Sequence, residues 1–207
     1  MKVMVFGATG GVGRELVKQG LERGYQVSAF VRNPSKLSLN HENLTVIEGD
    51  VLITDVVSSS LEGHDAAICT LGGAMSKDNF LSSATKVIVN SLEKQGVGRF
   101  IVNSTIGVGD SAQQLTLAAK VFVKTVIRAA VAEHARQEEI VKASTLAWTI
   151  VRPGGLGNGE KTGQYVISSD PSETLGGTVA RADVAHFMLE LLEDATSFQR
   201  AISIVGQ

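Results

Sequence analysis

The chain has 207 residues, 43% of them apolar, and a formal net charge of −2 at pH 7. This length and composition fit one well-packed domain over residues 1–207. The balanced, interspersed charge lacks the basic excess that phosphate-backbone binding needs, so we expect no nucleic-acid partner. No charge-free apolar run approaches the roughly 18 residues of a membrane span, and the stretch Val3–Phe6 is too short for a signal-peptide core. We therefore expect a cytoplasmic protein without a membrane partner.

Strand-like and helix-like segments alternate along most of the chain. Compact apolar runs predict buried strands, and longer amphipathic runs predict helices. In chain order these are strand Lys2–Phe6, helix Gly11–Arg23, strands Gln26–Val31 and Leu44–Glu48, helix Thr54–Leu61, strand Asp65–Thr70, helix Asp78–Gln95, strand Arg99–Asn103, a long helical region Leu117–Ala143 and strand Ala147–Val151. Such alternation calls for parallel pairing with right-handed crossovers. We predict an α/β fold, a Rossmann-like doubly wound parallel sheet with helices on both faces.

The pattern loosens after Pro153. A glycine-rich stretch is followed by a strand-like segment Gln164–Ser168, a helix from Arg181 to about Leu192 and a closing strand Ala201–Val205. No linker or repeat marks off a second domain. We predict that residues 155–207 add a small C-terminal cap over one rim of the sheet, a minimal substrate lobe.

Twelve of the 22 glycines gather just after predicted strands, in Gly7–Gly13, Gly72-Gly73, Gly107–Gly109 and Gly154–Gly159. Ligands of open α/β sheets bind outside the carboxyl ends of the strands, where glycine lets backbone approach a ligand closely. These glycine-rich strand ends therefore predict one shared ligand-binding rim.

The segment Gly7-Ala8-Thr9-Gly10-Gly11-Val12-Gly13 joins the first strand to the first helix. In this context the pattern predicts a dinucleotide-binding loop. Gly7 permits the tight turn, Gly10 lets backbone reach a pyrophosphate, and Gly13 allows close packing of helix on strand. The exposed N–H groups of the helix start favour an anionic phosphate. The alternative is a glycine-rich loop without a ligand.

The end of the second strand indicates which dinucleotide binds. No Asp or Glu occurs between Arg23 and His41, where an acidic residue would bind the ribose hydroxyls of NAD. Arg32 and Lys36 stand there instead, and both can bind a 2′-phosphate. The sequence therefore predicts NADP(H) as the cofactor. A solvated basic turn remains the alternative, for Lys36 more than for Arg32.

Several segments resemble the atypical short-chain dehydrogenase/reductase superfamily. Besides the glycine loop these are Glu48-Gly49-Asp50-Val51, Asn103-Ser104-Thr105, Thr149–Gly155 and Ala182–Leu189. The similarity covers nearly the whole chain and is strongest to the small NAD(P)H-binding proteins grouped with flavin reductase/biliverdin reductase B and with NmrA-like proteins.

The resemblance implies further cofactor contacts. Asp50 and Val51 would contact the adenine. The adjoining ribose side would meet Thr70, Leu71 and Gly72, and the nicotinamide carboxamide would meet Pro153 and Gly154.

The acid/base pair of the larger superfamily, Tyr-x-x-x-Lys, is missing. The only tyrosines are Tyr25 and Tyr165, and the positions expected for the pair hold Ala130 and His134. Ordinary alcohol oxidation and sugar-nucleotide epimerase or dehydratase chemistry are therefore disfavoured. Hydride delivery to an acceptor that takes its proton easily or from water survives the loss, with a flavin, quinone or tetrapyrrole as examples.

Three residues are candidates for work at the acceptor. The hydroxyl of Thr105, with Ser104 beside it, follows the fifth strand and is expected to touch the nicotinamide or the acceptor. The alternative is that both hydroxyls only bond the local turn. His134 is a candidate proton relay, because histidine titrates near neutral pH. Its alternative is a surface-exposed or capping histidine.

Other residues received simpler interpretations. Cys69 lies in an apolar run and is predicted to be a buried, inert thiol, and Trp148 is predicted to be core. The histidines have no metal-ligand spacing, so we expect no metal. The loop 73–80 either closes over the acceptor through Met75 and Phe80 or is a plain connection. Gly154-Gly155 stand where the flavin-reductase group carries a histidine, which weakens a specific assignment to biliverdin.

Two functions fit these observations. The first is an NADPH-dependent reductase of a small planar acceptor. The second is a non-catalytic NADP(H)-binding redox sensor, as the NmrA-like resemblance implies. For either we expect a monomer or a small homo-oligomer.

Overall fold

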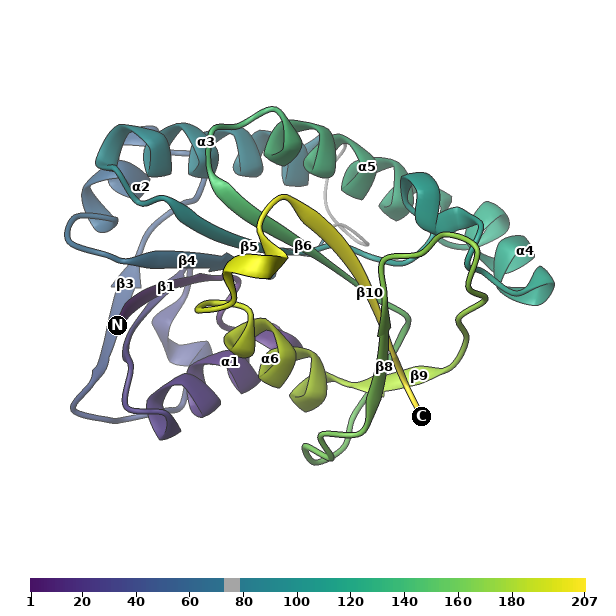
Figure 1. The fold of residues 1–207 in the computed structure, drawn as a ribbon. Helices are drawn as coiled ribbons and strands as arrows, with labels where there is room; N and C mark the ends of the chain where they lie inside the picture. Colours follow the sequence, from purple (N-terminus) through teal and green to yellow (C-terminus); the bar gives the residue numbers. More distant parts are fainter. Residues whose placement is uncertain (73–78) are drawn as a thin grey trace.

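A computed structural model of the protein describes residues 1–72 and 79–207. Its main body is a sheet of eight strands in the order β3-β2-β1-β4-β5-β6-β10-β8 (Figure 1). All neighbours pair in parallel except β8, which is antiparallel to β10. The strands are β1 Lys2–Phe6, β2 Gln26–Val31, β3 Leu44–Glu48, β4 Ala66–Cys69, β5 Arg99–Asn103, β6 Ala147–Pro153, β8 Tyr165–Ser168 and β10 Arg200–Gly206. The predicted doubly wound sheet is confirmed.

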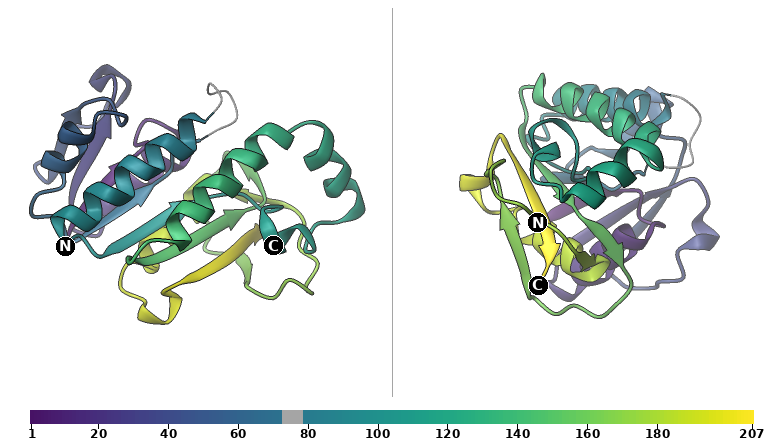
Figure 2. Two further views of the ribbon diagram at one scale, coloured as in Figure 1. Left: turned by 90° about the horizontal axis from the view of Figure 1, so that it is seen from above. Right: turned by 90° about the vertical axis from the view of Figure 1, so that its right-hand side faces the viewer.

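Helices cover both faces of this sheet. Helices α1 and α6 lie on one face and α2, α3 and α5 on the other, with α3 and α5 side by side (Figures 1 and 2). Their bounds are α1 Gly11–Glu22, α2 Thr54–Ser60, α3 Phe80–Gln95, α4 Leu117–Thr125, α5 Arg128–Lys142 and α6 Arg181–Glu190. Short 3-10 turns occupy Pro34–Lys36, Gly109–Ala112 and Ala195–Ser197.

The first strand shows why four of its five residues, Val3–Phe6, are apolar. Val3 and Val5 pack into the core under α1 and α6, whereas Met4 and Phe6 pack into the core under α2 and α3. Side chains alternate across a strand, so a strand covered on both faces must be apolar throughout. The core under α2 and α3 also buries Cys69 and Trp148, as predicted, and burial raises the pKa of the Cys69 thiol to about 12.

The predicted long helical region is divided into two helices. Helix α4 ends at Thr125, α5 begins at Arg128, and Val126 and Ile127 lie between them. This correction has a local cause, because Thr125, Val126 and Ile127 form a β-branched run with low helix propensity. Helix α4 contains no fully buried residue and lies at one end of the molecule (Figure 2).

The predicted C-terminal cap is mostly part of the main body. Strands β10 and β8 extend the sheet beyond β6, and α6 packs against α1. The smaller remainder includes a separate parallel pair, β7 Gly155–Gly157 with β9 Thr178–Ala180. Within residues 155–207, β8, α6 and β10 thus complete the sheet and its core, whereas β7 and β9 lie outside the main sheet.

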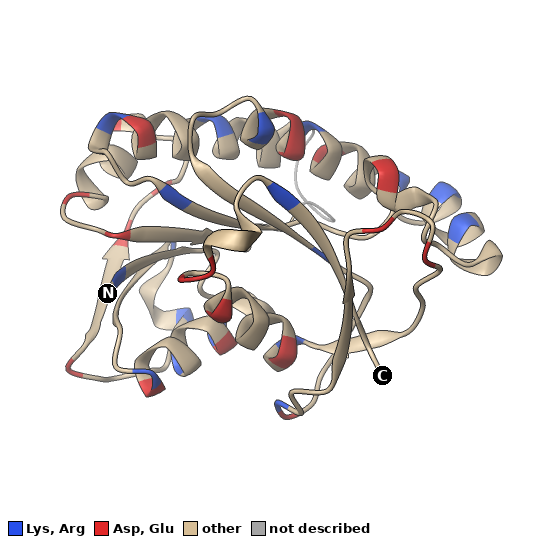
Figure 3. Ribbon diagram, viewed as in Figure 1, with Lys and Arg blue, Asp and Glu red and all other residues tan. Residues whose placement is uncertain are grey.

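Charged positions of both signs are spread over the described residues (Figure 3). Basic and acidic positions are interleaved along α3 and α5, whereas the charged residues of α4 are both lysines (Figure 3). No helix in the described ranges is long and apolar enough to cross a membrane.

Candidate functional site

The carboxyl ends of the central strands meet at one rim. Phe6 at the end of β1 pairs with Cys69 at the end of β4. Their continuations also touch, because a Cβ on Gly7 would stand 2.8 Å from the carbonyl carbon of Thr70. Beyond them, β5 pairs with β6 through Asn103 and Val151. The loops predicted to share a ligand site therefore follow neighbouring strands of one sheet.

The glycines of the β1–α1 loop have different physical roles. Gly7 has φ +84°, a left-handed conformation that favours glycine. A Cβ on Gly13 would lie 2.1 Å from the Gly7 carbonyl oxygen, so no side chain fits there. A Cβ on Gly10 would meet only that oxygen, at 3.3 Å, and Gly10 is exposed with an ordinary φ of −74°. Gly13 is thus required for packing, whereas Gly10 leaves space open at the rim.

The start of α1 suits an anionic group. Its N-cap, Gly10, makes no side-chain capping bond, and the first turn holds no acidic residue. No carboxylate of the first turn therefore neutralises its N–H groups or the positive end of the helix dipole. These residues fit the pyrophosphate of a dinucleotide, whose phosphates bind in such loops.

The basic residues after β2 are exposed beside this loop. Arg32 and Lys36 both face solvent, and the Arg32 guanidinium carbon lies 5.8 Å from the centre of the Phe80 ring. Sequence reasoning missed Arg14. Its side chain donates to the carbonyl oxygens of Thr9 (3.1 Å) and Lys36 (3.0 Å), and so braces the glycine loop against the basic turn. Its place directly after Gly13 was the available signal.

The residues that the resemblance assigns to adenine and ribose lie along the same rim. Asp50 is exposed and accepts a hydrogen bond from the Leu52 amide at 3.0 Å, whereas Val51 is buried. Thr70 and Leu71 are half-buried, and Gly72 is exposed.

Thr70, Pro153 and Gly154 also have contacts within the protein. The Thr70 hydroxyl donates to the carbonyl oxygens of Phe6 (3.2 Å) and Gly7 (3.3 Å) and so holds the β1 end. Pro153 is buried at the end of β6, and its carbonyl oxygen accepts from the Ile106 amide at 3.0 Å. A Cβ on Gly154 would lie 2.9 Å from Val205, so glycine is needed there for packing.

The two hydroxyls after β5 have unlike surroundings. Ser104 is buried, and its hydroxyl donates to Glu138 Oε1 at 2.8 Å. Thr105 is half-buried, and among the described residues its hydroxyl makes one contact, at 3.4 Å to the Ile106 carbonyl oxygen. Thr105 is therefore able to bond a ligand, whereas Ser104 belongs to a buried cluster.

That cluster is ionic and was not found from the sequence. Arg152 forks onto Glu138 with bonds of 2.9 and 2.6 Å and also pairs with Asp110 at 2.7 Å, and Lys142 pairs with Glu138 at 2.9 Å. Burial raises the pKa of Glu138, but hydrogen bonds and charge from Arg152, helped by Lys142 and Ser104, outweigh burial and hold the pKa below its usual value. The cluster fixes the junction of β5, β6 and α5 behind Thr105.

Of the two sequence interpretations of His134, the structure contradicts the surface-exposed one. His134 is buried, and its Nδ1 lies 2.9 Å from Gln137 Oε1. The amide nitrogen of Gln137 in turn donates to the hydroxyl of Thr85 in α3. Burial lowers the pKa of His134, so the ring is neutral at pH 7. The contact between His134 and Gln137 therefore belongs to the buried interface between α5 and α3.

Neither tyrosine stands at the end of β5. The Tyr25 hydroxyl bonds Glu193, and the Tyr165 hydroxyl pairs with His186 Nδ1 at 3.2 Å. Of the predicted closing loop, residues 73–78 with Met75 are outside the described residues, and Phe80 is half-buried at the start of α3. Among the side chains that the structure describes, no group of three or more His, Cys, Asp or Glu is placed to hold a metal ion.

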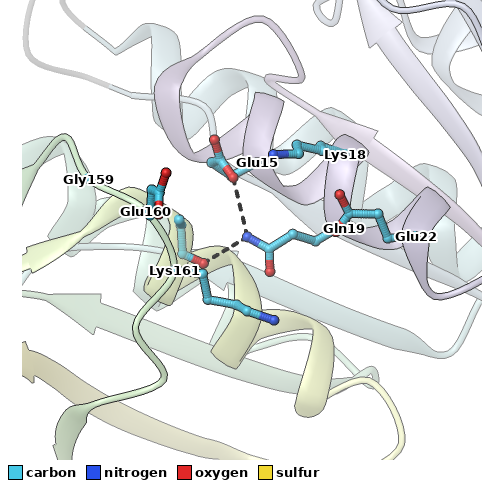
Figure 4. Close-up of a pocket in the computed structure, with 8 residues that line it drawn as sticks. Glu15, Lys18, Gln19, Glu22, Gly159, Glu160 and Lys161 are labelled. Carbon is cyan, nitrogen blue, oxygen red and sulfur yellow. Dashed lines mark hydrogen bonds between the residues drawn. The ribbon is translucent and has the colours of Figure 1, made fainter.

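A separate groove of about 360 Å³ runs along α1 (Figure 4). Glu15, Lys18 and Glu22 of α1 line one side, and the segment 159–161 lines the other. Between them the Gln19 amide donates to Glu15 and, at 2.9 Å, to the carbonyl oxygen of Ala182. The groove follows the later turns of α1 and not its start, so it is distinct from the rim.

Comparisons with known proteins identify the family of the chain. Residues 7–195 match the model of a family described as NAD(P)H-binding. An uncharacterized chloroplastic protein of Arabidopsis thaliana is 34% identical, over 100% of this chain and 77% of that protein. The structure of ChuY, an anaerobillin reductase from Escherichia coli O157:H7, matches 100% of this chain and 97% of its own with a TM-score of 0.84 and 29% identity. A short-chain dehydrogenase/reductase of Veillonella parvula DSM 2008 in complex with NADP shares the fold, with a TM-score of 0.82, 19% identity and coverage of 99% and 94%.

Proposed function

The chain belongs to the NAD(P)H-binding family of oxidoreductases, and we propose that it is an NADPH-dependent reductase of a small planar acceptor. The observation that carries the proposal is the pairing, at one rim, of an open glycine loop with the half-buried hydroxyl of Thr105, whose hydrogen bond to the Ile106 carbonyl oxygen is long, at 3.4 Å. No tyrosine stands beside that hydroxyl, because Tyr25 and Tyr165 are bonded elsewhere.

Preference for NADPH over NADH rests on the end of β2. Arg32 and Lys36 are exposed beside the glycine loop, and the segment between Arg23 and His41 has no carboxylate to bind ribose hydroxyls. A guanidinium and an ammonium both favour a 2′-phosphate, and the guanidinium binds it with a planar fork.

The chain contributes binding and orientation. When bound, the nicotinamide cofactor supplies the hydride. The N–H groups at the start of α1 bind the phosphates, and the Ser104–Glu138–Arg152 cluster holds the end of β5 in place. Thr105 donates a hydrogen bond to the acceptor. Its hydroxyl is only a weak acid, so it is a poor source of the proton. Acceptors that take a proton readily or from water are therefore favoured over simple aldehydes and ketones.

A screen of NADPH oxidation tests this proposal. We expect turnover with at least one flavin, quinone or tetrapyrrole and poor turnover with simple aldehydes and ketones. The activity that the name of ChuY records supports including linear tetrapyrroles in the screen. A protein that binds NADPH tightly but oxidises none of it above the uncatalysed rate with any of these acceptors is not a reductase of this class.

A second candidate function is an NADP(H)-binding redox sensor, favoured by the exposed face of α4. Leu117, Val121 and Phe122 are 82%, 63% and 52% exposed, an apolar surface of the kind that marks a protein or ligand contact. A sensor predicts a partner whose retention on the immobilised protein changes when NADPH is exchanged for NADP⁺. Retention should fall for Phe122→Ser, and unchanged retention in both comparisons contradicts the sensor.

A further inference from the structure

The side chain of Arg181 lies across the first residue of α1. Arg181 is the first residue of α6 and is half-buried. A Cβ on Gly11 would stand 2.4 Å from its Cδ and 2.6 Å from its Nε. The absence of a side chain at Gly11 thus leaves the space that Arg181 fills, and it brings a cation from the C-terminal part of the chain to the glycine loop.

The C-terminal segment holds this guanidinium in place. Arg181 Nη1 donates to Asn158 Oδ1 at 2.7 Å. The segment that carries Asn158 is tied to α6 by the buried Asp183, which accepts hydrogen bonds of 2.8 Å from the amides of Thr162 and Gly163 and from the Thr162 hydroxyl. The residues that follow Asn158 lie opposite α1 (Figure 4). The position of Arg181 is therefore built into the fold.

A cation at this position is unfavourable unless an anion joins it. The start of α1 already presents the positive end of its dipole, and its first turn has no carboxylate. Across the ranges that the structure describes, no Asp or Glu pairs with Arg181. Arg14, the other guanidinium of this loop, is bonded to two carbonyl oxygens. Arg181 bonds one side chain and keeps most of its five N–H donors for a ligand.

We infer that Arg181 binds the pyrophosphate of the dinucleotide, opposite the N–H groups of α1. The inference rests on the proposed cofactor site and adds a residue to it. Arg181 recognises the bridging phosphates, which NADPH and NADH share, whereas Arg32 recognises the 2′-phosphate, which only NADPH carries. The C-terminal segment thus takes part in cofactor binding.

Calorimetric titration of Arg181→Ala tests the inference with three ligands. We expect binding of NADPH and of NADH to weaken by a similar factor of about 10 to 100, because a charge-assisted bond is lost. Binding of 2′-AMP, which has no pyrophosphate, should change less than about twofold on the same bond-energy scale. Lys161→Ala is the matched control, since it removes an exposed cation from the neighbouring segment and should leave all three affinities unchanged.

A second variant separates ligand binding from a structural role. Gly11→Ala places a methyl group where Arg181 lies, so it should weaken both dinucleotides in the parent and add no loss in the Arg181→Ala background. Unchanged dinucleotide affinity in a folded Arg181→Ala protein, an equal loss for 2′-AMP, or additive losses in the double variant would each overturn the inference and leave the proposed function standing. A parent protein that binds neither dinucleotide overturns both.

Discussion

The cofactor half of the rim is tightly built, whereas the acceptor half is open. Beside β1 and β4, the Gly10 amide bonds the Gly7 carbonyl oxygen at 2.9 Å and Thr70 bonds the same turn. Beyond β5, helix α4 leaves Leu117 and Val121 82% and 63% exposed. A rigid site can bind a cofactor that a whole family shares, whereas the surface around the acceptor is free to differ between relatives with different acceptors. Under the proposed function, this difference predicts that specificity for the acceptor is set beyond β5.

The largest expected effect separates two glycines of the cofactor half. Gly10→Val should abolish binding of NADPH and NADH, because its side chain fills the space at the rim, while its Cβ meets the protein only at 3.3 Å. Thermal unfolding and circular dichroism should stay near those of the parent. Gly13→Ala should instead lower the free energy of unfolding by about 3 kcal/mol, because its methyl group overlaps the Gly7 carbonyl.

The contrast between Gly10 and Gly13 has a direct counter-test. Tight dinucleotide binding by a folded Gly10→Val protein would show that the loop does not bind the pyrophosphate. A Gly13→Ala protein as stable as the parent would show that the loop relaxes more easily than its geometry indicates.

The next effect concerns the acceptor half. Thr105→Val keeps the shape and removes the hydroxyl, so the rate with a reducible flavin or quinone should fall by a factor of about 10 to 1,000, while the affinity for NADPH changes little. His134→Ala should lower the rate less, because its polar contact is to Gln137 within buried packing. A larger loss for His134→Ala than for Thr105→Val would reassign the proton donor.

Arg32→Ala should affect one cofactor alone. Loss of a charge-assisted contact of about 1.5–3 kcal/mol should weaken NADPH about 10- to 150-fold and barely change NADH. Titration of both cofactors measures this, and Lys36→Ala, an exposed point charge, should cause a smaller loss of the same kind. Equal affinity of the parent protein for NADPH and NADH would reject this assignment.

The smallest effect is an acid sensitivity of the ionic cluster under Thr105. Folding lowers the pKa of Glu138 below its unfolded value of about 4.3 and the pKa of Asp110 below its unfolded value of about 3.9. Both carboxylates therefore stabilise the fold above these unfolded pKa values, and this stabilisation is lost as the pH falls through the folded pKa values. The free energy of unfolding should be nearly flat from about pH 7 to 5 and fall below about pH 4. Denaturant titrations should show a shallower acid slope for Glu138→Gln, and an unchanged slope would remove Glu138 as a cause.

Local patterns were sufficient to predict the frame of the protein. Strands Lys2–Phe6, Gln26–Val31, Leu44–Glu48 and Arg99–Asn103 have their predicted bounds. For β1, β2 and β5 the reason is that a strand buried on both faces is a mostly apolar run closed by turn residues, whereas β3 is a partly exposed edge strand. The glycine loop was equally visible, since its turn, helix start and close packing are all encoded within Gly7–Gly13. Parallel order then placed the strand ends at one rim.

Contacts between distant segments were decided only by the tertiary structure. The sequence showed neither that Ser104, Glu138 and Arg152 meet nor that β10 completes the sheet. It also did not show that Arg181 covers Gly11, because these two residues share no local pattern and meet only when α6 packs beside α1. A charged side chain has the same letter on a solvated surface, in a buried pair or over a phosphate loop, and its neighbours in space determine which of these it is.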